Sequence, residues 1–137
     1  METGNLLRHQ IINNLLEQPT ENVADDAVQL WHQMASKIIP LVGEVGFSSL
    51  YGRSLFLMHS RLPWLPADAL TTQNADRFTP LKISFEGQTP VQAGAANSLL
   101  LITFSDILAS LIGEHLTTSI LRSAWVNEKD AKELKNE

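Results

Sequence analysis

The chain contains no cysteine. This absence excludes a disulfide framework, a thiolate metal site and a cysteine nucleophile. Basic residues are also few, because ten Lys and Arg stand against fifteen Asp and Glu and leave a formal charge of −5. Proteins that bind nucleic acid need a basic surface to neutralise phosphates, so this charge balance argues against a nucleic-acid partner.

Long apolar runs are scarce as well. The strongest run, residues 99–112, is shorter than the roughly 20 residues of a bilayer-spanning helix, and it is interrupted by Asp106. A charge at that depth in a membrane is costly. The first residues lack the basic-then-apolar layout of a signal peptide. We therefore expect no membrane partner and, given the missing cysteines, a cytoplasmic protein.

What the sequence does have is helical periodicity. The 137 residues, 44% of them hydrophobic, suit one domain with its own core. The apolar residues recur at steps of three and four, which is typical of amphipathic helices. The sequence predicts an all-α fold: a single-domain helical bundle of about five to six helices over residues 1–126. Residues 127–137 are expected to form a charged C-terminal tail or helix extension.

The clearest apolar stripe predicts a long second helix. Its members step by three and four residues along the chain: Ala24, Ala27, Trp31, Met34, Ile38, Leu41 and Val45. Pro40 lies inside this stripe and predicts a kink, because proline removes one backbone hydrogen bond and crowds the preceding turn. Gly43 and Gly46 follow closely and indicate a hinge or a close helix crossing.

A central helix is predicted at about residues 90–112. Thr89-Pro90-Val91-Gln92 is a capping box with proline at the first helical position. The helix that follows is apolar on most sides, which places it in the middle of a bundle. Residues 81–87 fit both a strand and a short helix. Because no second strand is available for pairing, we expect a helix there.

Asp106 is the most informative candidate site residue. It lies in the most apolar helix, where an unpaired charge is costly, and it forms a polar line with Thr103 and Ser110. We expect a buried or half-buried ion pair with Arg53 or Arg61. The alternative is that the polar line faces a cavity or an interface. Four further charged residues are expected to cross-link the helices around Gly43 and Gly113: Glu44, Arg53, Glu114 and Arg122.

His32 suggests a second kind of function. An acidic helical bundle of this size with an exposed mid-helix histidine resembles histidine phosphotransfer domains in size and class. The resemblance implies that His32 accepts a phosphoryl group near a stabilising cation. The motif of that family differs, because Lys37 lies five residues after His32 and the first glycine is Gly43.

No catalytic, metal or cofactor motif is present: the chain has no HExxH, no GxSxG and no GK[ST] sequence. The leading hypothesis is therefore a non-enzymatic helical module for protein–protein interaction or oligomerisation, with bacterial signalling or regulation as its expected setting. The expected partner is a second copy or another protein, and residues 6–16 are a candidate dimer seam. A third hypothesis is a small-molecule sensor with a pocket near Gly43, Gly46 and Asp106.

Overall fold

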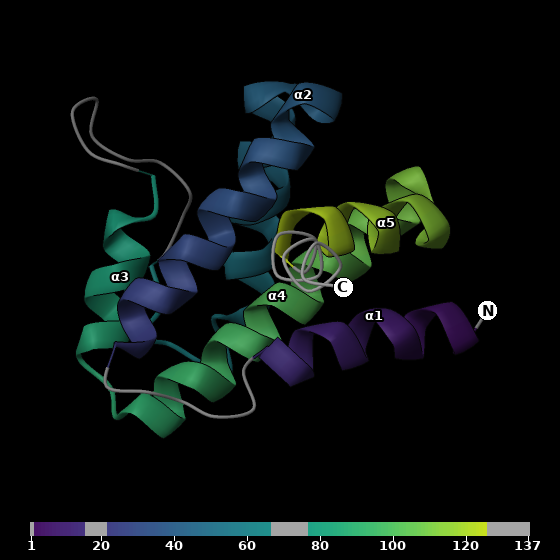
Figure 1. Ribbon diagram of the computed structural model, residues 1–137. Helices are drawn as coiled ribbons and strands as arrows, with labels where there is room; N and C mark the ends of the chain where they lie inside the picture. Colours follow the sequence, from purple (N-terminus) through teal and green to yellow (C-terminus); the bar gives the residue numbers. More distant parts are fainter. Residues whose placement is uncertain (1, 16–21, 67–76, 126–137) are drawn as a thin grey trace, which may run out of the picture.

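A computed structural model describes residues 2–15, 22–66 and 77–125, and it contains five helices in these ranges (Figure 1). They are α1 (Glu2–Leu15), α2 (Val23–Met58), α3 (Thr79–Glu86), α4 (Pro90–Ile112) and α5 (Glu114–Trp125). The described ranges contain no strand, so the predicted all-α bundle is confirmed and residues 81–86 are helical. The expected tail at 127–137 lies outside the described residues.

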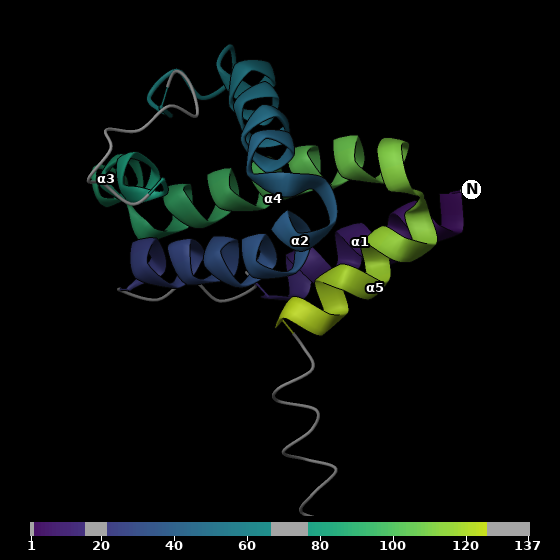
Figure 2. The same ribbon diagram turned by 90° about the horizontal axis from the view of Figure 1, so that it is seen from above.

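α4 is the central helix of the fold, as predicted. It packs against each of the other four helices, and Figures 1 and 2 show it running through the middle of the molecule. The capping box forms as expected, because Thr89 Oγ1 accepts from the Gln92 amide at 3.1 Å and Gln92 Oε1 accepts from the Thr89 amide at 3.3 Å. Gly113 ends the helix with a φ of +100°, a backbone conformation that glycine adopts without steric cost.

α4 is also long and apolar enough, by length and composition alone, to cross a membrane. This differs from the expectation of no spanning segment, because the apolar run from residue 99 is only the second half of α4. The same properties belong to a helix at the core of a bundle. Two polar side chains on its inner face, Asn97 and Ser105, are fully buried.

Aromatic packing around Trp31 forms the centre of the core. Trp31 is fully buried, and its ring lies 5.2 Å from Tyr51, 5.3 Å from Phe104 and 5.8 Å from Phe78, measured between centroids. These rings come from both halves of α2, from the residue before α3, and from α4. Tilted and edge-on aromatic pairs stabilise beyond the area they bury, by about 0.5–1.5 kcal/mol each.

The predicted kink at Pro40 is wrong in its position. Within α2, Gly43 is the residue with non-helical dihedral angles, at φ 84° and ψ 165°, and the helix passes through Pro40. Proline fixes φ near the helical value, so it can remain inside a helix, whereas the change of direction needs a positive φ that glycine supplies. α2 is therefore two straight segments joined at Gly43 (Figure 2).

The break at Gly43 also changes which face of α2 is buried. The predicted stripe is buried from Ala24 through Ile38, but Leu41 and Val45 are exposed. After the break a new set of residues faces the core, beginning at Phe47. The predicted stripe was therefore wrong at its last two positions: Val45 follows the break, after which the buried face changes, whereas Leu41 is exposed at the end of the first segment.

Candidate functional site: a buried arginine and two open glycine turns

A buried arginine holds α1 against the corner between α4 and α5. The side chain of Arg8 is only 2% exposed, although it carries a full charge. Arg8 lies four residues before Ile12, which is fully buried, so both side chains project from the same face of α1. Arg8 was not among the residues predicted from the sequence. Arg8 could have been found from its spacing, because it lies on the same face of the amphipathic helix as the apolar residues.

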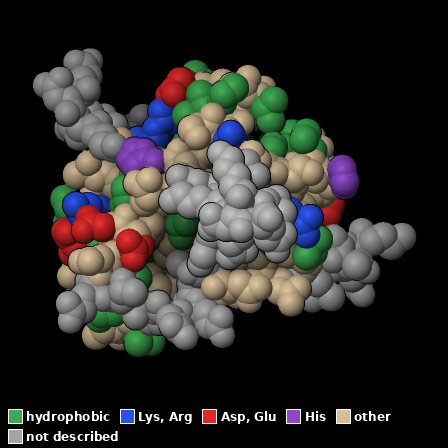
Figure 3. Space-filling model, viewed as in Figure 1, with side chains coloured by type: hydrophobic (Ala, Val, Ile, Leu, Met, Phe, Trp, Pro, Cys, Tyr) green, Lys and Arg blue, Asp and Glu red, His purple; other side chains and the backbone are tan. Residues whose placement is uncertain are grey.

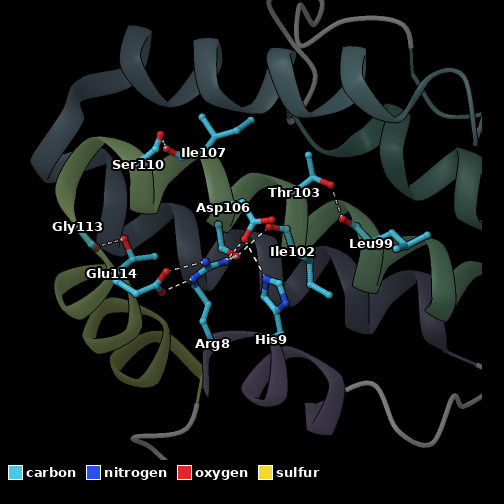
Figure 4. A network of polar contacts seen from close by, with 12 residues as sticks. Arg8, His9, Leu99, Ile102, Thr103, Asp106, Ile107, Ser110, Gly113 and Glu114 are labelled. Atoms are coloured by element: carbon cyan, nitrogen blue, oxygen red, sulfur yellow. Dashed lines mark hydrogen bonds and ion pairs between the residues drawn. The ribbon is translucent and has the colours of Figure 1, made fainter. Parts of the chain in front are cut away.

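The Arg8 guanidinium binds two carboxylates and a hydroxyl (Figure 4). Its Nε donates to Glu114 Oε2 at 2.6 Å and its Nη2 donates to Glu114 Oε1 at 2.9 Å, which is a bidentate pair. Its Nη1 donates to Ser105 Oγ at 2.7 Å and to Asp106 Oδ1. The neighbouring His9 places Nε2 2.9 Å from the same Asp106 oxygen. We call Arg8, His9, Ser105, Asp106 and Glu114 the Arg8 cluster.

The cluster changes the pKa values of its members. Burial by itself lowers the pKa of Arg8, but hydrogen bonds to Glu114 and Asp106 and the charges of both raise it above its ordinary value. The hydrogen bond from Arg8 lowers the pKa of Glu114 against the opposing effect of burial. Each shift favours the charged form, so the buried cation and its carboxylates stabilise one another.

The predicted ion pair of Asp106 therefore exists with a different partner. Its side chain is 45% exposed, as a half-buried pair requires, but the cation is Arg8 of α1. Arg53 and Arg61, the expected partners, are both exposed on and just after α2. The other two members of the polar line bond to their own helix: Thr103 to the Leu99 carbonyl and Ser110 to the Ile107 carbonyl (Figure 4).

Glu44 does cross-link two segments, although not through Arg53. Its carboxylate pairs with Arg77, which precedes α3, and the Arg77 guanidinium also lies 5.3 Å from the centre of the Phe47 ring. Because Glu44 follows Gly43 directly, this pair fixes the chain next to the break in α2. Arg77 was not a sequence candidate.

Two glycines with positive φ form open turns at the surface. Gly43 breaks α2 and Gly113 separates α4 from α5, and a Cβ built on either residue meets nothing within 4 Å. The expected close helix crossing at Gly43 is therefore wrong. At Gly46 an added Cβ meets the Val42 side chain of the preceding turn, at 3.1 Å from its Cβ. Glycine is needed at position 43 because it adopts a positive φ, and not because another helix packs closely there.

Exposed aliphatic side chains flank both turns. Leu41 and Val45 lie on either side of Gly43, and Leu111 and Leu116 lie on either side of Gly113. Val45 is 81% exposed and Leu111 is 66% exposed. Figure 3 shows hydrophobic side chains at the top of this face, where α2 changes direction, interspersed with other atoms. We call the four aliphatic residues and the two glycines the glycine-turn surface.

The remaining candidate, His32, is exposed as the sequence predicted. Its ring packs edge-on against Phe78, with 5.0 Å between the centroids. Lys37 is exposed on the same helix. Phosphoryl transfer through His32 stays a prediction, and so does the small-molecule pocket near Gly43, Gly46 and Asp106.

Within the described parts of the chain, no group of three or more His, Asp or Glu side chains could hold a metal ion. Comparison with known proteins gives no further guide. No protein-family model, no curated protein and no solved structure matches this chain.

Proposed function

We propose that this protein is a non-enzymatic helical interaction module that binds a second copy of itself through the glycine-turn surface. The observation that carries the proposal is the exposure of four large aliphatic side chains around Gly43 and Gly113. Apolar side chains that gather on a protein surface can mark interaction sites, and two exposed aliphatic residues flank each of the two turns. The proposal thus assigns a partner to residues that the fold itself leaves exposed.

The shape of this surface supports close contact. Because both turns are made by glycine and have open space at the Cβ position, a partner can approach the backbone between the flanking aliphatic residues. Glu44, the charge nearest to Gly43, is already paired with Arg77, so its burial at an interface would not leave it without a cation. A two-fold interface uses the same patch on both copies, so the aliphatic residues of one copy can meet those of the other.

Sedimentation velocity and light scattering over a range of concentrations test this proposal. We expect a concentration-dependent dimer for the wild-type chain. Val45→Ser and Leu111→Ser should each weaken dimerisation about tenfold or more, because each removes apolar area from both halves of a symmetric interface.

Ile83→Ser is the matched control. Ile83 is 62% exposed but lies on α3, away from the glycine-turn surface, so its substitution should leave the dimerisation constant unchanged. A chain that stays monomeric at every concentration contradicts the proposal. An equal effect of Ile83→Ser contradicts the assignment of the surface.

A further inference from the structure

α1 is attached to the rest of the fold on one side. It packs against α4 and α5 and, among the described residues, contacts neither α2 nor α3. Figure 1 shows it lying along one edge of the molecule. In the sequence, residues 16–22 join it to α2 and include Gln18-Pro19. α1 is therefore a helix whose departure leaves the packing of α2, α3, α4 and α5 on one another in place.

The surface beneath α1 is chemically specific. Asp106 and Glu114 present carboxylates from two different helices, and the hydroxyl of Ser105 lies between them as a further acceptor. A guanidinium satisfies all three groups at once, whereas an aliphatic side chain satisfies none of them. The charge complementarity thus selects a helix that carries an arginine in its apolar face.

Ile12 adds a second requirement. It is fully buried at four residues from Arg8, so an occupant needs an aliphatic side chain one turn after the arginine. Asn13 contributes a contact at the next position, because Ser98 Oγ of α4 donates to Asn13 Oδ1 at 2.8 Å. An amphipathic helix that binds a groove is recognised through this kind of spacing.

We propose that the α4–α5 surface is a helix-binding site whose external occupant is α1 of a second copy, so that two copies exchange their α1 helices. Every contact of the Arg8 cluster then forms between chains with the same partners that it has within one chain, as in domain swapping. This inference rests on the proposed self-association and names how the two copies are joined.

The position of the cluster fits this mode of association. Glu114 follows Gly113, so the carboxylate that holds Arg8 lies beside one of the two turns of the glycine-turn surface. A second copy that docks on that surface is brought to the corner of α4 and α5, where α1 enters its site. Tethering raises the effective concentration of the second helix once the first contact has formed.

The absence of cysteine makes a clean test possible. Asn13→Cys is placed in one chain and Ser98→Cys in another, since the side chains at these positions are in contact across α1 and α4. The two variants are mixed, oxidised mildly and separated on a non-reducing gel. We expect a disulfide-linked dimer at a yield about tenfold above that of a control mixture in which Ser36→Cys replaces Ser98→Cys. Ser36 is an exposed serine of α2, a helix that α1 does not contact.

Substitution of Arg8 tests whether cross-linking depends on the contacts of the Arg8 cluster or arises from random collisions between chains. Arg8→Ala in the chain that carries Asn13→Cys should lower the cross-linked yield about tenfold, and Arg8→Lys should lower it less, since lysine keeps the charge but not the bidentate pair. Circular dichroism verifies that each variant remains helical. The double variant Asn13→Cys/Ser98→Cys measures, in one chain, how readily the same bond forms.

Each outcome bears on the inference. A mixed-chain yield no greater than that of the Ser36 control overturns the exchange of α1, even where the double variant cross-links within one chain. In that case, a dimer seen by light scattering leaves the proposed self-association standing. A chain that is monomeric throughout overturns both.

Discussion

The indole nitrogen of Trp31 donates a 2.8 Å hydrogen bond to Oδ1 of Asn97 and joins α2 to α4 in the centre of the core. Both side chains are fully buried, so neither group can turn to water if its partner is removed. The two residues are 66 positions apart in the sequence. This bond therefore fixes the register between the two longest helices.

Asn97→Ala should lower the free energy of unfolding by about 1–2 kcal/mol, because it leaves the Trp31 N–H buried and unpaired. Urea denaturation followed by circular dichroism measures the loss. In a Trp31→Phe background, which has no indole donor, Asn97→Ala should cost less. Equal losses in the two backgrounds would show that the hydrogen bond contributes nothing.

Glu114 should make stability depend on pH. The hydrogen bond from Arg8 lowers its pKa in the folded chain. The stabilisation is thus complete above the ordinary pKa of a glutamate, about 4.3, and it is lost as the pH falls through the lower folded value. Urea denaturation between neutral pH and about pH 3 should show Glu114→Gln destabilised at neutral pH, with a difference from wild type that narrows in acid. A difference independent of pH contradicts this assignment.

Gly43→Ala should lower the free energy of unfolding by about 1–3 kcal/mol, since a φ of +84° with an extended ψ is a conformation that residues with a Cβ rarely adopt. The cost is conformational, because an added Cβ at residue 43 has open space. Gly87→Ala is the matched control. Gly87 has a φ of −80° and its added Cβ makes only ordinary contacts, so that change should be close to neutral. Thermal unfolding measures the loss of stability in both variants. An equal loss in the two would contradict the conformational role of Gly43.

Removing the capping box of α4 should lower the free energy of unfolding by a smaller amount. Thr89→Ala removes the acceptor of the Gln92 amide and should cost about 1 kcal/mol. Thr79→Ala at the first turn of α3 is a suitable comparison, because no side-chain cap bond is made at the start of that helix. A loss at Thr79 as large as that at Thr89 would contradict the role of the capping bond.

The helices could be predicted because their signals are local. The capping box, the glycine at 113 and the apolar steps of three and four each act within one or two turns, and α4 began and ended as predicted. The glycines at 43 and 46 indicated a hinge or a close crossing, and α2 does break at Gly43, but the kink placed at Pro40 and the continuous buried stripe were wrong. Periodicity indicates where a helix is amphipathic but does not reveal a single residue at which the chain turns and begins a new buried face.

The partner of Asp106 could not be predicted for a different reason. A lone carboxylate in an apolar helix indicates that a cation must be nearby, but which cation depends on packing between distant segments. Arg8 is 98 residues from Asp106, and its own signal was its position one turn before Ile12. Arg53 and Arg61 were nearer in sequence, and the structure leaves both exposed.

The contacts of α1 also set an order of assembly during synthesis. Arg8 bonds to Glu114, which is 106 residues further along the chain. At about 5–20 residues per second, α1 leaves the ribosome roughly 5–20 s before the helix that completes its binding site. Throughout that interval its arginine and its apolar face have no site on their own chain.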